Sequence, residues 1–188
     1  MITGAHPFHF LWDLFQKDQA TFSFSKYVYA PDSLFDERQF FAVLGSDLSE
    51  ERVSRELASL RPDQELAIHS TVQVKGKNLH IPMIDFSVED AVTGAVFDRM
   101  SRYLPKAIML NMAVYASVRS FHAYSTTLLT PREWLEFMGR LLLINPPRRP
   151  DIVDSRWIGH RLIWGFGSLR WSNNSGQYVG LPSRIAFP

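Results

Sequence analysis

Three separated segments of the chain carry residue types that bind metal ions and phosphates. The first is an apolar run that leads into Asp85, with Glu89 and Asp90 a few residues further on. A carboxylate at the rigid end of a strand is a suitable ligand for Mg²⁺ or Mn²⁺, which prefer oxygen and hold substrate phosphates. Acids in the first turn of a helix and an acidic helix cap give the same pattern without a metal. Alone, this segment leaves both interpretations open.

The second segment is Ser120-Phe121-His122, which continues to Tyr124. In a strand, Ser120, His122 and Tyr124 would point to one face, where a serine and a histidine could donate hydrogen bonds to a triphosphate. A single histidine at such a position is often purely structural. A serine hydrolase is disfavoured, because Ser120 lacks the strand-turn-helix context of a nucleophile and a residue two positions away does not by itself supply base geometry.

The third segment is Val153-Asp154, an apolar residue followed by an acid, with a run rich in Arg, Trp and Gly over 156–171. Glycine lets the backbone approach a ligand closely, while arginine and tryptophan offer phosphate forks and stacking faces. Arg156 and His160 follow Asp154 closely and are binding candidates. Tryptophan usually belongs to a core, so we expect burial of at least two of Trp157, Trp164 and Trp171.

Composition limits the chemistry that these segments can perform. The 188 residues include no cysteine, which excludes disulfides, thiolate catalysis and cysteine-rich zinc sites, so any metal must be held by carboxylates or histidines. The formal net charge of +1 creates no global attraction to nucleic acid. From Arg132 onward, however, the chain has eight arginines and no lysine. This bias suits phosphate recognition, although an ordinary solvated surface would also account for it.

The N-terminal part shows no targeting or membrane signal. It lacks a basic region and a cleavage site, and no apolar run approaches the roughly 20 residues that span a bilayer. We therefore expect a cytoplasmic protein with no membrane partner. The stretch 5–25 is rich in aromatic residues and is expected to pack either on the body of the protein or on a protein partner.

Hydrophobic spacing and capping residues predict four helices, over 36–44, 49–60, 88–104 and 130–143. Thr130 is the clearest N-cap, because proline and Glu133 complete a capping box. Strand-forming runs are expected as a hairpin of 66–74 with 79–86, as strands over 107–117 and 118–124, and as a hairpin of 166–171 with 178–181. The order predicts an α+β fold, a mostly antiparallel sheet with flanking helices.

The length suits one domain over 1–188. Within it, 1–62 would hold the aromatic segment and helices, and 63–188 the core that carries the three segments.

Taken together, the three segments resemble the catalytic core of the archaeo-eukaryotic primase-polymerase superfamily. Its members carry apolar residues before Asp-x-Asp or Asp-x-Glu, then Ser-x-His, then an apolar residue before Asp. Residues 83–87, Ser120 to His122 and Val153-Asp154 match these motifs in chain order, and 161–170 is similar to the Arg-Leu and Gly-Ser-Leu run that follows them. More narrowly, the chain resembles small bacterial primase-like domains of conflict and defence gene neighbourhoods.

The resemblance implies a primase-polymerase-like catalytic core and a role for each matching residue. Asp85, Asp154 and His122 would be catalytic. Asp85 and Asp154 would hold Mg²⁺ or Mn²⁺, helped by Glu89. Ser120 and His122 would contact the phosphates of an incoming nucleotide, which Arg170 would help to position. The implied partners are a nucleotide and DNA or RNA.

Ser87 is a departure from this pattern, because the family has its second carboxylate there. A neutral hydroxyl is a far weaker metal ligand, and losing a ligand commonly costs orders of magnitude in rate. We therefore expect nucleotide or nucleic-acid binding with weak or no metal-dependent nucleotidyl transfer. Whether the chain is a DNA or RNA primase with an incomplete metal site stays open. The alternative is a non-catalytic nucleic-acid-sensing or structural subunit of a bacterial defence complex.

Overall fold

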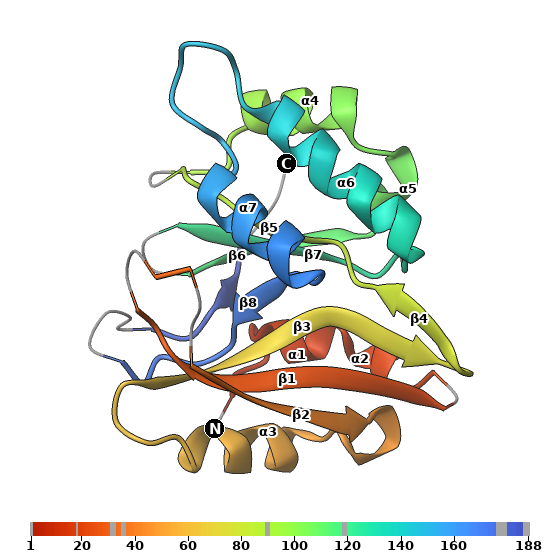
Figure 1. Ribbon diagram of the computed structural model, residues 1–188, viewed down its shortest axis with the longest axis vertical. Helices are drawn as coiled ribbons and strands as arrows, with labels where there is room; N and C mark the ends of the chain where they lie inside the picture. The colour runs from red at the N-terminus through yellow and green to blue at the C-terminus, as the bar shows by residue number, and fades with distance from the viewer. Residues whose placement is uncertain are drawn as a thin grey trace.

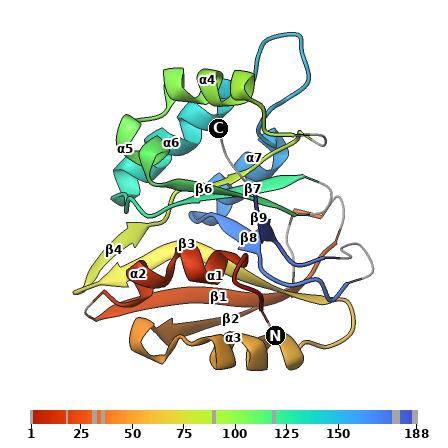
Figure 2. The same ribbon diagram turned by 180° about the vertical axis from the view of Figure 1, so that it is seen from behind.

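Two antiparallel sheets, one above the other in Figure 1, form the framework of the protein. The structure is a computed structural model that describes residues 2–17, 19–30, 33–34, 37–88, 91–117, 120–175 and 180–185. Helices cover the upper sheet on its far side from the lower one, and another helix lies beneath the lower sheet (Figures 1 and 2). This arrangement confirms the α+β fold of antiparallel sheets with flanking helices.

The lower sheet has the order β2-β1-β3-β4, and the short strand β8 also pairs with β3. All of its pairings are antiparallel, and β4 and β8 bond to different parts of β3. The strands are β1 (Ala20–Val28), β2 (Arg38–Leu44), β3 (Gln64–Val74), β4 (Lys77–His80) and β8 (Ser168–Arg170).

The upper sheet has the order β5-β7-β6-β9, again antiparallel throughout. Its central strand pair is followed in sequence by the longest helix of the described residues, α6. The strands are β5 (Met83–Asp85), β6 (Met112–Ala116), β7 (Phe121–Ser125) and β9 (Ser183–Arg184).

The longer helices each begin at a side-chain N-cap that accepts a hydrogen bond from the first turn: Ser49, Thr93, Thr130 and Asp154. The predicted capping box at Thr130 and Glu133 is confirmed. The helices are α1 (Pro7–Phe10), α2 (Trp12–Phe15), the 3₁₀ turn η1 (Gly45–Asp47), α3 (Glu50–Ala58), α4 (Gly94–Tyr103), α5 (Lys106–Leu110), α6 (Pro131–Ile144) and α7 (Ser155–Trp164).

The helix predicted over 36–44 is wrong, because Arg38 to Leu44 form strand β2. This strand pairs with β1 in register from Tyr27 opposite Arg38 to Thr21 opposite Leu44. Its aromatic and β-branched residues favour a strand, and the edge of β1 supplies the ladder. A helix was expected because the segment begins with acidic residues, which are common in the first turn of a helix. Residue 36 itself lies outside the described residues.

Two further boundaries differ from the expectation. The predicted strand over 107–117 begins as the short helix α5, whose Ile108 and Met109 are buried, and becomes strand β6 only at Met112. The helix expected over 88–104 begins at Gly94, where Thr93 caps it. In the first case a short helix takes residues that hydrophobic spacing assigned to a strand, and in the second the hydrogen bond from Val96 N–H to Thr93 sets the start of the helix.

Pro82 divides the run 79–86 between the two sheets. It follows β4 of the lower sheet and precedes β5 of the upper sheet. Proline has no N–H for a ladder bond, so pairing stops there and the chain crosses over. This crossing delivers Asp85 to the upper sheet.

For the hairpin predicted between 166–171 and 178–181, the described residues show a different partner for the first strand. Strand β8 pairs with β3 in the lower sheet, and the later strand β9 pairs with β6 in the upper one. Residues 176–179 lie outside the described residues. The turn-forming residues near position 174 therefore connect the sheets.

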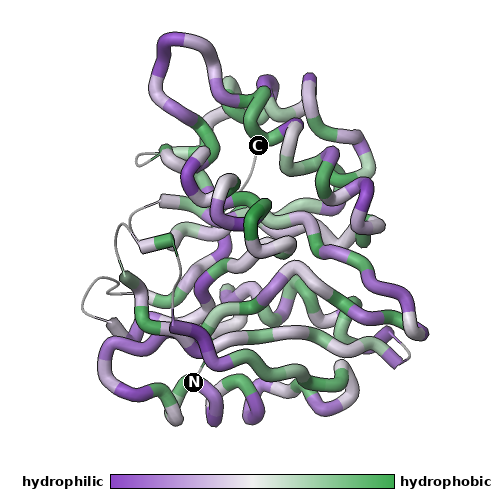
Figure 3. The backbone as a smooth tube through the Cα atoms, viewed as in Figure 1, coloured by the Kyte–Doolittle hydropathy of each residue, from purple (hydrophilic) through white to green (hydrophobic). Residues whose placement is uncertain are grey.

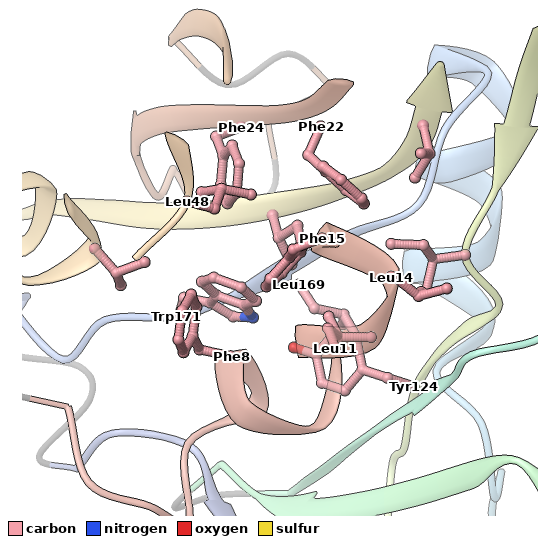
Figure 4. Close-up of a cluster of buried hydrophobic side chains, with 14 of the residues drawn as sticks. Phe8, Leu11, Leu14, Phe15, Phe22, Phe24, Leu48, Tyr124, Leu169 and Trp171 are labelled. Carbon is pink, nitrogen blue, oxygen red and sulfur yellow. The ribbon is translucent and has the colours of Figure 1, made fainter. Parts of the chain in front are cut away.

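The aromatic N-terminal stretch packs into the body, which is the first of its two expected locations. Phe8, Phe15 and Phe24 are buried, and Phe15 and Phe24 pack edge-to-face against Trp171 within a cluster of apolar side chains (Figure 4). Trp157 and Trp164 stay partly exposed, so the expectation that at least two of the three tryptophans are buried is wrong.

Candidate active site

A pocket of about 380 Å³ is lined by residues of both sheets and of helix α7. One wall comes from the end of β1 and the start of β2, another from β5 and β7, and a third from α7 and β8. Seven of the eight binding or catalytic candidates named from the sequence line it: Asp85, Ser120, His122, Asp154, Arg156, His160 and Arg170. The remaining candidate, Glu89, lies outside the described residues.

Asp85 and His122 meet because β5 and β7 are neighbouring antiparallel strands. The two residues are direct cross-strand partners, and Asp85 Oδ1 lies 3.7 Å from His122 Nε2. Side chains at opposed positions share one face of a sheet. Pairing of two strands nearly forty residues apart in sequence thus forms the centre of the pocket.

Asp154 joins this pair through the backbone. Its N–H donates to the carbonyl oxygen of Asp85 at 2.9 Å, and Val153 forms an isolated bridge with Phe86. The Asp154 side chain is the N-cap of α7, with Oδ1 accepting from the N–H of Trp157 at 2.8 Å. One carboxylate therefore both starts a helix and faces the site.

Burial changes the protonation of the central pair. Desolvation, with the nearby Asp154 carboxylate, raises the pKa of Asp85 to about 8, while the charges of Arg161 and Arg170 oppose this rise. Burial, aided by Arg170, lowers the pKa of His122 to about 3. At neutral pH Asp85 is thus mostly protonated and His122 neutral. Their 3.7 Å contact is a polar contact between uncharged groups.

Among the described residues, the lining of the pocket contains two carboxyl groups, those of Asp85 and Asp154. Ser87 lines it at the position where the family motif has an acid. Across the described ranges, no three or more His, Asp or Glu side chains are grouped to hold a metal ion. Asp85 and Asp154 together offer hard oxygen donors, which fit one Mg²⁺ or Mn²⁺ completed by water and phosphate oxygens.

Arg170 is fixed in place by backbone carbonyls. Its guanidinium donates to the carbonyl oxygens of Ser172, Gly180 and Ser117, the last at 2.9 Å. It is buried, and its charge acts on Asp85 and His122. These bonds tie β8 to the segments before β7 and β9, so Arg170 organises the wall of the pocket.

Two arginines of the pocket were not among the sequence candidates. Arg161 is 6% exposed and lines the pocket from α7. Its spacing of three from the buried Ile158 could have indicated an inward face. Arg38, on β2, stacks 4.1 Å above the ring of Tyr27 and donates to the hydroxyls of Ser25 and Ser168. No local signal could have identified Arg38, because its partners lie on two other strands, β1 and β8.

This fold and pocket define a class of α+β protein in which a strand-end carboxylate, a cross-strand histidine and a helix-capping carboxylate meet beside arginines. A family model described as archaeo-eukaryotic primase 1D-like matches residues 44–183, roughly three quarters of the chain. The chain belongs to this archaeo-eukaryotic primase-like family. Comparison with curated proteins and with solved structures yields no significant match.

No helix within the described residues has the length and apolar character needed to cross a bilayer.

Proposed function

We propose that the protein binds a nucleotide or a nucleic-acid end in this pocket, with weak or no metal-dependent nucleotidyl transfer. The observation that carries the proposal is the meeting of Asp85, His122 and Asp154 in one pocket with several arginines. A family match alone would not show that the motif residues of this chain still share a site.

The charge of the pocket supports a polyanionic ligand. Its lining contains four arginines and two carboxyl groups: Arg38, Arg156, Arg161 and Arg170, with Asp85 and Asp154. Guanidinium groups form strong bonds with phosphate oxygens. His122 is neutral and can offer a ring N–H, and the hydroxyl of Ser120 can add a further hydrogen bond to a phosphate. A triphosphate is thus the ligand group that this lining suits best.

The same donor set argues for one divalent cation. Asp85 and Asp154 would hold Mg²⁺ or Mn²⁺, and Asp85 would release its proton on binding. When bound, the ion would neutralise phosphate charge and polarise the phosphoryl group. A two-metal site needs further oxygen ligands, and Ser87 is a poor one. For this reason we propose that the main activity of the site is to bind a nucleotide or a nucleic-acid end, and that nucleotidyl transfer there is slow or absent.

Calorimetric titration with NTP and dNTP, with and without Mn²⁺, tests the proposal. We expect binding that Mn²⁺ strengthens, and that Asp154→Asn weakens about tenfold or more. Asparagine is also a good N-cap, so this variant removes charge without removing the helix start. Asp98→Asn, on the exposed side of α4, is the matched control and should bind like wild type.

Two results would contradict the proposal in different ways. Failure of wild-type protein to bind any nucleotide, with or without Mn²⁺, would reject the binding function. Rapid primer synthesis or extension by wild type that is abolished in Asp85→Ala would instead establish an active polymerase. A non-catalytic sensing or structural subunit remains the second candidate, and Ser87 is the residue that favours it.

A further inference from the structure

The loop over 145–153, here called the arginine loop, projects from the body between α6 and α7. It extends at the top of Figures 1 and 2 and is coloured hydrophilic at its tip in Figure 3. Its tip contains Arg148 and Arg149 between prolines, and both arginines are exposed. The function proposed above makes no use of these two side chains.

Side-chain hydrogen bonds hold the base of the arginine loop in place. The side chain of Asn145 accepts hydrogen bonds from the N–H groups of Ile152 and Val153 at 2.9 and 2.8 Å, and donates to the carbonyl of Val153 at 2.9 Å. The guanidinium of Arg99 donates to the carbonyls of Ile144 and Asn145. Since prolines also restrict φ along the tip, the loop holds its arginines in a preorganised position.

The backbone at Arg148 adopts a conformation that suits glycine better than arginine. Its φ is 60°, in the left-handed region that residues with a side chain rarely occupy. The chain nevertheless has an arginine there. Within the described residues, no hydrogen bond or ion pair engages the side chain of Arg148 or Arg149. Arg148 thus combines a costly backbone conformation with an exposed, positively charged side chain. This combination indicates that the side chain is kept for a functional contact.

The arginine loop continues directly into the wall of the pocket. The carbonyl of Ile152 accepts from the N–H of Ser87 at 2.9 Å, and Val153 bridges to Phe86. Two residues further, Asp154 and Arg156 line the pocket itself. Arg148, Arg149 and Arg156 therefore lie on one short segment that leads from solvent to the site.

We propose that Arg148 and Arg149 contact the sugar-phosphate backbone of a nucleic-acid strand whose end occupies the pocket. The inference rests on the proposed function and adds the path of the strand outside the pocket. Guanidinium forks suit successive phosphates, and the only apolar side chains at the loop tip are prolines, so a phosphate backbone fits better than an apolar protein surface. The contact is independent of base sequence.

Fluorescence anisotropy with a labelled single strand of about 12 nucleotides tests this contact. In Arg148→Ala/Arg149→Ala, we expect affinity near 0.1 M salt to fall on the order of tenfold, and the salt slope of log K to become shallower by about 1.4. The affinity for free NTP should not change. Arg148→Lys/Arg149→Lys should keep most of the affinity and the slope, because charge dominates such contacts.

Two controls separate the loop from general charge and from folding. Arg55→Ala/Arg61→Ala removes two exposed arginines at the other end of the molecule, near α3, and should change binding little. Arg148→Gly relieves the left-handed backbone, so it should weaken strand binding while the melting temperature stays equal or rises.

The possible results distinguish this inference from the function on which it rests. Equal effects of the two alanine pairs, or no effect of the loop pair, would overturn the inference alone. Loss of NTP binding together with strand binding in the loop variant would also overturn it, since the arginines would then act in the pocket. If wild type binds neither NTP nor the strand, the proposed function itself fails.

Discussion

At the scale of single residues, Asp85 has properties that oppose stability and favour ligand binding. A carboxyl group with a pKa raised to about 8 is protonated in the free protein, and a cation or a neighbouring positive charge is needed to ionise it. Burial of such a group is costly and gives the fold nothing in return. The strand that carries it is nevertheless held firmly, because Asp85 pairs with His122 in β7 and accepts from the backbone of Asp154.

The first prediction concerns this carboxyl group. The folded state keeps a proton that the unfolded chain releases near its ordinary pKa of 3.8, so this group lowers the free energy of unfolding as pH rises towards about 8. Because the buried histidines act in the opposite direction up to about pH 7.5, the decrease should appear in the wild type between about pH 7.5 and 8.5. Asp85→Asn should remove this decrease and be more stable than wild type at pH 8 by about 1 kcal/mol or more. Urea unfolding at several pH values measures both quantities.

A wild-type stability that rises over this pH range would contradict the prediction. Asp85→Asn should also lose Mn²⁺-dependent nucleotide binding, which separates the stability effect from general damage. This combination of greater stability and lost binding is typical of a residue retained for function.

At the scale of elements, α7 depends on the same carboxylate that faces the site. Asp154 Oδ1 accepts from the N–H of Trp157 and so caps the helix. The chain ends this helix at Gly165, whose φ of 77° is a left-handed C-cap. Between these ends, Arg161 is the buried charged residue that α7 directs into the pocket wall.

The second prediction separates the two roles of Asp154. Asp154→Ala should lower the free energy of unfolding by about 1 kcal/mol because the cap is lost, whereas Asp154→Asn should lower it by only a few tenths. Both variants should lose metal-dependent nucleotide binding. Denaturant unfolding combined with calorimetry measures the two effects; equal stability of the two variants would show that the cap contributes little.

The elements that the sequence predicted correctly are helices whose first residue is set by a neighbouring capping residue. Helix α6 begins at its predicted capping box, and α3 begins directly after its predicted N-cap, Ser49. Strand β2 was missed because it becomes a strand only beside β1, and the pairing of β8 with β3 was not expected because a turn signal does not identify a sheet. Propensity is weak where a tertiary partner decides the conformation.

At the scale of the whole molecule, buried histidines are distributed over both sheets and the N-terminal segment. Burial lowers the pKa of each of them, to about 4 for two and about 3 for the others: His6, His80, His69 and His122. All are neutral in the folded protein and would be protonated on unfolding in mild acid. His69 Nε2 is hydrogen-bonded to the hydroxyl of Ser25, and His80 Nδ1 to that of Ser70.

The third prediction is that the whole fold is sensitive to acid. Histidines with lowered pKa make stability fall as pH drops from 6.5 towards 4, while Asp85, with its raised pKa, acts in the opposite direction. Unfolding near pH 5 should therefore take up about three protons. The slope of the free energy of unfolding against pH measures this number, and a flat profile between pH 6.5 and 4.5 would contradict it.

The sequence by itself determined several local features of this protein: the N-caps at Ser49 and Thr130, the α+β class and the three motif segments, because their information lies within a few residues. It also showed that Ser87 stands where the family motif has a carboxylate. Only the tertiary structure decided which residues share the pocket. Strand pairing places His122 opposite Asp85, Pro82 sends the chain between sheets, and β2 brings Arg38 to the opposite wall. Such contacts join residues that are far apart in the sequence. They stabilise the protein only after both sheets have formed, so no local pattern predicts them.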